Sequence, residues 1–262
     1  MAAVERLAQA QVTRTPCAPV RDLIGTDDLA AAYSVQQRLV QARLAAGARV
    51  VGRKIGATSE AVQKQLGVDQ PDFGYLLDEM DVSDAAREGG APISMHALLQ
   101  PRVEAEVAFR LGRDLDLPEE ELTLEAVRAA VDVALPALEI VDSRIADWQI
   151  GFTDTVADCA SSALFVVGAD ERPLSEVTPV DVVMSLTING EERSAGNGAA
   201  CLGDPLEALR WLAVQSARFG DPLRAGQLVL SGALGPFVPF GPGDRVEASI
   251  SGFDTLSVEF KE

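Results

Sequence analysis

The segments with strand character in this chain are grouped together instead of alternating strictly with helices. The clearest of them covers residues 103–111, where an apolar residue occupies every second position, which is the period of a β-strand. Similar patterns cover 135–142, 163–168, 227–232, 245–250 and 255–260, and Asn189-Gly190 between two strand-like arms predicts a β-hairpin. The grouping favours an α+β fold over a doubly wound parallel sheet.

Helical signals are concentrated in the first fifty residues, where Thr26 is the expected N-cap of a helix that ends at Gly47. Asp204 and Pro205 have the order of a helix N-terminus, and we expect this second helix to end at Gly220. Two further helices are expected over 58–67 and 123–134, and residues 69–80 have the composition of a loop.

Residues 81–95 are the best candidate for an internal boundary, because two glycines and a proline interrupt a charged stretch there. They divide a helical N-terminal region, 1–80, from a β-rich region, 81–262. Composition does not shift across this segment, so we expect the two regions to form one compact unit.

The chain carries a strong negative charge, with 22 Lys+Arg against 40 Asp+Glu and a net charge of −18. Such a charge repels nucleic-acid phosphates and anionic lipid surfaces, and no basic stripe offsets it. No run of about 18 apolar residues is present to span a bilayer. We therefore expect neither a nucleic-acid partner nor a membrane.

The supply of histidine and cysteine limits the chemistry that the chain can perform. Its single histidine, His96, is expected at the surface or in packing, and most catalytic triads and zinc sites need at least one histidine. Cys17, Cys159 and Cys201 are odd in number and form no C-x-x-C, which fits a reducing cytoplasm. An active site here must be built largely from carboxylates, lysine, hydroxyl groups and main chain.

Two glutamates share one face of the strand over 103–111. Glu104 and Glu106 are two residues apart, so they point to the same side, and adjacent carboxylates repel each other. The pair is tolerated if the face is solvated, if one acid is protonated, or if a cation lies between them. A solvated face is the ordinary explanation of such a pair.

A third glutamate favours the cation. Glu139 interrupts an apolar run, so its carboxylate is expected to be partly buried and to need a partner. Three carboxylates from two strands, without a nearby histidine, suit hard cations such as Mg²⁺ or Mn²⁺. Asp142 and Arg144, which follow closely, are expected to form a local ion pair.

Lys54 and Asp72 are further candidates. Lys54 lies between apolar neighbours in a strand-like stretch, which indicates either a partly buried lysine that binds an anion or an edge lysine that points to water. Asp72 follows a proline and precedes Phe73-Gly74, a setting in which aspartate usually stabilises a turn.

Several of these motifs together resemble a known family. The segments GRKIGATSEAVQKQLGVDQPDFGYLLDEM, PRVEAEVAF, ALEIVDSRIADWQIGFTDTVADCASSALFVVG and LGDPLEALRWLA are similar to the 2-hydroxypenta-2,4-dienoate (2-keto-4-pentenoate) hydratases. These share their fold with the 2-oxohex-3-enedioate decarboxylases in the fumarylacetoacetate hydrolase superfamily. The resemblance covers residues 25–262 and implies a rolled, mixed β-sheet core with flanking helices, of the fumarylacetoacetase C-terminal type.

The resemblance also implies roles for particular residues. It makes Glu104, Glu106 and Glu139 the ligands of one divalent metal, Mg²⁺ or Mn²⁺. It places Lys54 and Asp72 in the substrate pocket as the catalytic pair and Ser161 beside it as a substrate contact. The residues alone do not decide which member of the pair is the acid and which is the base.

The implied reaction is hydration of a 2-hydroxy-2,4-dienoate to a 4-hydroxy-2-oxoalkanoate in the catabolism of aromatic compounds. The alternatives are a decarboxylase on the same scaffold and a non-catalytic partner subunit. The resemblance implies a homo-oligomer and leaves a complex with another pathway enzyme as a further alternative. Arg53, Cys159, Ala233 and Gly235 depart from the family pattern; Arg53 is therefore a candidate to bind a second substrate carboxylate.

Overall fold

Two β-sheets organise the computed structural model, which describes residues 1–59, 63 and 70–262. The first has seven strands in the described ranges, in the order β2-β1-β9-β4-β5-β6, with β10 also paired to β4. They are β1 (Val50–Gly56), β2 (Asp72–Leu77), β4 (Arg102–Leu111), β5 (Val131–Val141), β6 (Ser162–Val167), β9 (Leu228–Ala233) and β10 (Val238–Pro239).

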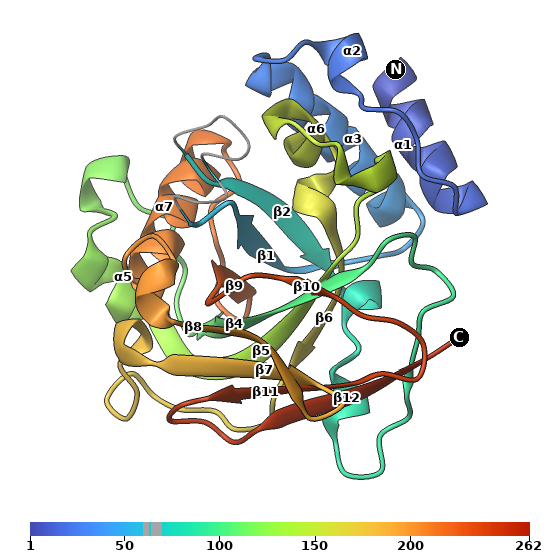
Figure 1. The fold of residues 1–262 in the computed structure, drawn as a ribbon. Coiled ribbons are helices and arrows are strands. Elements are labelled where there is room, and N and C mark those ends of the chain that lie inside the picture. Colours follow the sequence, from blue (N-terminus) through green and yellow to red (C-terminus); the bar gives the residue numbers. More distant parts are fainter. Residues whose placement is uncertain (60–62, 64–69) are drawn as a thin grey trace.

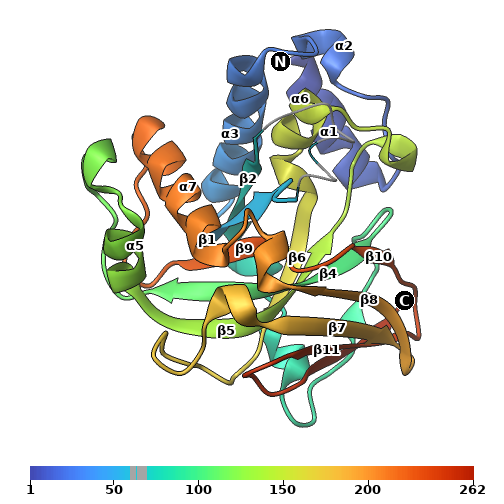
Figure 2. The ribbon, with the colours of Figure 1, turned by 60° about the vertical axis from the view of Figure 1, so that its left-hand side comes forward.

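The second sheet has the order β3-β12-β11-β7-β8 and lies below β4 and β5 in Figure 2. Its strands are β3 (Ile93–Ser94), β7 (Val183–Ile188), β8 (Glu191–Asn197), β11 (Arg245–Ile250) and β12 (Leu256–Lys261). Val107 and Phe109 of β4 belong to one apolar core with Leu186 of β7 and Val246 of β11. The apolar face of β4 is therefore buried, and the glutamate face is the opposite one.

Helices flank the larger sheet, as Figure 1 shows, and an upper group lies above β1 and β2. The upper group contains α1 (Ala2–Thr13), α2 (Arg21–Ile24), α3 (Leu29–Ala45) and, from later in the chain, α6 (Phe152–Ala157). The helices α5 (Leu124–Ala130) and α7 (Pro205–Arg218) pack against each other on the left of Figure 1. Leu7, Val35 and Val156 belong to a second, smaller core that joins α1, α3 and α6. Among the described residues, no helix is long and apolar enough to cross a bilayer.

The α+β prediction is confirmed, and so are the main strands. The alternating segment is β4, the run containing Glu139 is β5, and Asn189-Gly190 connects β7 to β8. Asp204 caps α7 by accepting a hydrogen bond from the Leu206 N–H at 2.8 Å. The larger sheet takes strands from both sides of residue 80, since β1 and β2 pair with each other and β1 also pairs with β9.

Three local predictions were wrong. Residues 69–80 do not form a loop throughout, because Asp72–Leu77 is strand β2, paired to β1 and fully buried. Asp28, and not Thr26, caps α3, since its carboxylate accepts from the Ala31 N–H. The helix expected over 123–134 ends at Ala130, where β5 begins. The helix expected over 58–67 lies outside the described residues.

Candidate active site

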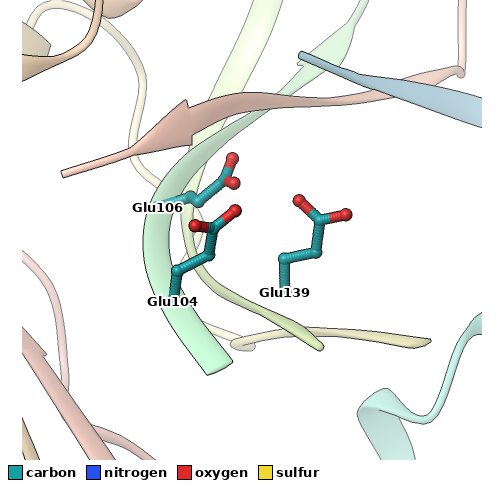
Figure 3. Close-up of side chains that lie close together, drawn as sticks. All are labelled: Glu104, Glu106 and Glu139. Atoms are coloured by element: carbon teal, nitrogen blue, oxygen red, sulfur yellow. The ribbon is translucent and has the colours of Figure 1, made fainter. Parts of the chain in front are cut away.

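Three glutamates meet on one face of the larger sheet. Glu104 and Glu106 leave the same side of β4, and Glu104 lies directly opposite Glu139 in the β4–β5 register. One carboxylate oxygen from each lies within 4.8 Å of the others, and Figure 3 shows the three side chains gathered together. The exposed fractions are 7%, 0% and 0%, so the glutamates do not form a solvated face.

The hydrogen-bonding capacity of these carboxylates is largely unused. Gly232 N–H donates to Glu106 Oε2 at 2.7 Å. Within the described part of the chain, Glu106 Oε1 and Glu139 Oε2 have no hydrogen-bond partner. A buried carboxylate oxygen without a donor costs about 1–3 kcal/mol or more. Such a cluster must therefore hold protons or a cation.

Lys54 supplies one positive charge to the cluster. It is 2% exposed on β1, and its Nζ lies 3.2 Å from Glu139 Oε1. Burial alone would lower the pKa of Lys54, but the surrounding carboxylates, Glu139 first, raise it overall. Lys54 is therefore a buried cation and not an edge lysine.

Asp72 lies beside Lys54 on the neighbouring strand. It pairs in register with Gly56, and a side chain at Gly56 would have its Cβ 2.2 Å from Asp72 Oδ1 and 3.4 Å from Lys54 Nζ. Burial raises the pKa of Asp72, and the Lys54 charge partly opposes this rise. The aspartate therefore lies next to Lys54, and the glycine leaves room for both groups.

Ser161 lies in the segment between α6 and β6. Cys159, Ala160 and Ser161 all have left-handed backbone angles, with φ of 55°, 53° and 54°. This segment packs on β2, where a Cβ at Gly74 would lie 2.3 Å from the Cys159 carbonyl oxygen. Ser161 Oγ is buried and has no hydrogen-bond partner among the described residues. Non-glycine residues in this conformation store strain, which often accompanies functional sites.

The protonation of the glutamates reflects their crowding. Burial, followed by the negative charge of Glu139, raises the pKa of Glu104 from 4.5 to about 8. Burial likewise raises the pKa of Glu106 and of Glu139, and for Glu139 the Lys54 charge opposes the rise. In the absence of a cation, the cluster therefore retains protons at neutral pH.

The three glutamates fit a divalent cation. They offer convergent oxygens that lack donors, and an all-oxygen set suits Mg²⁺ or Mn²⁺. The site can thus hold a hard metal ion with Lys54 and Asp72 next to it.

Arg53 is not brought to this cluster. It neighbours Lys54 in β1, and successive side chains of a strand point to opposite faces. Its guanidinium pairs with Asp221 and lies over the Tyr75 ring, 4.9 Å from the centroid. Arg53 therefore has a carboxylate partner from the protein itself.

The segment containing Asp142 and Arg144 also differs from the prediction. Arg144 Nε donates to Asp158 Oδ1 at 2.5 Å, while Asp142 accepts from the N–H groups of Leu99 and Gln100. The expected local ion pair is thus replaced by a longer-range one. Sequence reasoning also missed Thr155, whose hydroxyl donates to Asp72 Oδ2 at 3.0 Å.

This fold and the buried acidic centre define the class of protein. Residues 50–261 match the family described as "Fumarylacetoacetate (FAA) hydrolase C-terminal", and the chain belongs to that family.

Among individual relatives, a 2-keto-4-pentenoate hydratase of Paraburkholderia xenovorans is 50% identical, with 99% of this chain and 94% of that protein covered. A 2-hydroxyhexa-2,4-dienoate hydratase of Comamonas testosteroni is 42% identical, with 98% and 96% covered. The 4-oxalocrotonate decarboxylase of Pseudomonas putida G7, solved with magnesium and adipate, is 31% identical. Its TM-score is 0.92, and 99% of this chain and 96% of that chain are covered.

Proposed function

We propose that this protein is a metal-dependent hydratase of the catabolism of aromatic compounds. Its substrate would be a 2-hydroxy-2,4-dienoate, or the equivalent 2-oxo-4-enoate, and its product a 4-hydroxy-2-oxoalkanoate. The observation that carries this proposal is the buried carboxylate cluster with unused oxygens in a chain that is 50% identical to a 2-keto-4-pentenoate hydratase.

Glu104, Glu106 and Glu139 would hold Mg²⁺ or Mn²⁺. When bound, the ion supplies Lewis-acid stabilisation of the negative charge that develops on the oxygen at C2 of the substrate. The Gly232 N–H contributes by fixing the orientation of the Glu106 carboxylate.

The proposed hydration takes place in two steps. Ketonisation removes the proton of the 2-hydroxyl group and adds a proton at C5, which gives a 2-oxo-3-enoate. Water then adds its oxygen at C4, and a proton is added at C3. Both steps need a group that exchanges protons close to the substrate chain.

We assign this proton exchange to Asp72. Its pKa is raised by burial, and Oδ1 has no hydrogen-bond partner within the described ranges, so it can hold or release a proton. Lys54 stays protonated because carboxylates surround it, and it would orient the substrate or the attacking water. Ser161 Oγ would donate to the substrate or to that water.

The decisive experiment follows the ultraviolet absorbance of 2-hydroxypenta-2,4-dienoate with purified protein. We expect Mg²⁺ or Mn²⁺ to accelerate its loss, EDTA to abolish the acceleration, and the product mass to equal that of substrate plus one water. Undiminished turnover in the metal-stripped protein would contradict the metal assignment.

A decarboxylase is the second candidate. The observation in its favour is the TM-score of 0.92 to a 4-oxalocrotonate decarboxylase. Release of CO₂ from a 2-oxo-3-enedioate, without hydration of the monoacid, would replace the hydratase with this activity. Failure of the protein to bind Mn²⁺ in calorimetry would instead favour a non-catalytic partner subunit.

The assembly and location are further parts of the proposal. We infer a cytoplasmic homo-oligomer: the three free cysteines fit a reducing compartment, and the oligomer follows the family resemblance. Light scattering on the purified protein tests this: a single-chain mass would contradict the oligomer.

A further inference from the structure

A hydrogen bond from helix α6 is made to only one of the two oxygens of Asp72. Thr155 is 5% exposed, and its hydroxyl donates to Asp72 Oδ2 at 3.0 Å. The other oxygen, Oδ1, is buried and has no hydrogen-bond partner among the residues described. The two oxygens of this carboxyl group therefore have different environments.

The position of Thr155 relative to Asp72 is fixed by a buried amide. Gln36 of α3 is 0% exposed, and its Nε2 donates to the Phe73 carbonyl at 2.9 Å and to the Val156 carbonyl at 2.8 Å. Phe73 follows Asp72 in β2, and Val156 follows Thr155 in α6. The Gln36 amide thus ties the strand to the helix next to the Thr155–Asp72 hydrogen bond.

The free oxygen borders the same space as the Lys54 ammonium group. A Cβ placed on Gly56 would lie 2.2 Å from Asp72 Oδ1 and 3.4 Å from Lys54 Nζ, so both groups border the same small space. Lys54 in turn contacts Glu139. Oδ1 therefore borders a space that it shares with Lys54, whose ammonium group contacts the glutamate cluster.

We propose that Thr155 is a positioning residue that restricts proton exchange by Asp72 to Oδ1, an inference that rests on the proposed function. While the Thr155 hydroxyl donates to Oδ2, that oxygen acts as an acceptor, and a proton carried by the carboxyl resides on Oδ1. The hydrogen bond also opposes rotation of the carboxyl group, so the reacting oxygen keeps one position relative to the substrate.

The chain offers a matched control on the same helix. Thr153 is 1% exposed, and its hydroxyl also makes one hydrogen bond, but to the Gly25 carbonyl at 2.9 Å. T153V and T155V therefore remove the same group from the same helix, and only T155V removes a contact to Asp72.

The experiment measures hydration of 2-hydroxypenta-2,4-dienoate by wild type, T155V, T155A, T155S and T153V, each loaded with Mn²⁺. Calorimetric Mn²⁺ stoichiometry gives the fraction of intact sites, so that kcat is expressed per site. We expect T155V and T155A to lower kcat by about 10- to 100-fold with KM and Mn²⁺ affinity little changed. T155S, which keeps the hydroxyl, is expected to restore most of kcat, and T153V to leave kcat unchanged.

The possible contrary results separate the two proposals. If wild type hydrates the dienoate and any folded variant without the Thr155 hydroxyl keeps its kcat within about threefold, the Thr155 role is wrong and the proposed function stands. A fall in kcat that T153V shares, or that T155S does not relieve, also overturns the role. If wild type binds Mn²⁺ but hydrates nothing, the proposed function fails and the Thr155 role fails with it.

Discussion

Buried carboxylates occur in two regions of this molecule, and the regions differ in how many hydrogen-bond donors they supply to the carboxylate oxygens. One is the group of helices α1, α2, α3 and α6, called the helical region below. There, Asp154 of α6 accepts hydrogen bonds from the N–H groups of Val20, Arg21 and Gly151, each at 2.8 Å. In the larger sheet, Glu139 Oε2 has no donor in the described part of the chain. Both side chains are fully buried, so burial alone does not separate structural acids from functional ones.

The difference lies in how the bonding capacity of each acid is used. An acid whose oxygens are all occupied by the protein joins segments together and has nothing left for a ligand. An acid left with free oxygens costs folding energy unless a proton, a cation or a substrate completes it. We therefore expect substitutions in the helical region to change stability and those in the sheet to change metal binding and turnover.

The largest effect is expected for E106Q. The amide keeps the size of the side chain and an acceptor for the Gly232 N–H, but it removes one negative charge from the metal ligands. We expect kcat to fall on the order of 10³-fold and Mn²⁺ affinity to fall in parallel. Kinetics and calorimetry measure both, and wild-type values for E106Q would remove Glu106 from the metal site.

The opposite behaviour is expected for D158N. Asp158 pairs with Arg144 in the interior, and loss of its charge leaves a buried guanidinium unpaired. We expect the free energy of unfolding in urea to fall by about 3 kcal/mol, with Mn²⁺ affinity of the folded protein retained. The exposed pair Arg87–Asp84 provides a control, since D84N should cost less than about 1 kcal/mol. Loss of metal binding without loss of stability would contradict the division between the two regions.

The stability and the metal affinity of the glutamate cluster should both depend on pH. The pKa of Glu104 rises from 4.5 to about 8 on folding, so the metal-free folded state binds a proton more tightly than the unfolded state does. This contribution to stability is complete below pH 4.5 and is lost as pH rises through about 8. A cation competes with that proton, so its apparent affinity should increase with pH, by up to about tenfold per unit, until pH 8.

Thermal unfolding of the metal-free and Mg²⁺-loaded protein between pH 6 and pH 9 tests this expectation. The stabilisation by Mg²⁺ should grow with pH across this range. Stabilisation that is independent of pH would show that the glutamates are already ionised in the metal-free protein.

The smallest effect is expected for H96A. The single histidine is exposed, and its Nδ1 contacts Arg14 at 2.9 Å. We expect turnover to be unchanged and stability to change by less than about 0.5 kcal/mol. A large loss of turnover would mean that imidazole takes part in the reaction after all.

Patterns within single strands predicted much of this molecule. The alternation around Glu104 and Glu106 and the apolar run around Glu139 identified β4 and β5, because a two-residue period and a hydrophobic run are local signals. The register that places Glu104 opposite Glu139 is not local, and it became visible only when the strands were paired.

The misjudged residues depended on contacts distant in sequence. Strand β2 contains the turn-forming residues Asp72 and Gly74. It is a strand because β1 pairs with it and because the Phe73 ring stacks on Tyr33, with the ring centroids 4.9 Å apart. Thr155 gave no signal, since a threonine in a short helix has no distinctive pattern. Arg53 is a separate case: its position next to Lys54 in a strand implies that the two side chains face opposite sides, and its role as a substrate contact stays a prediction.

The placement of Glu104 across from Glu139 has a consequence for attempts to improve this protein. Two acids facing each other inside a sheet oppose folding, so an apolar residue in place of Glu104 should make the metal-free chain more stable. Glu139 differs, because it pairs with the buried Lys54. A search for heat-resistant variants that ignores turnover would therefore favour the loss of Glu104. Thermostability should be selected at positions remote from this strand pair, because stability and activity favour different residues at position 104.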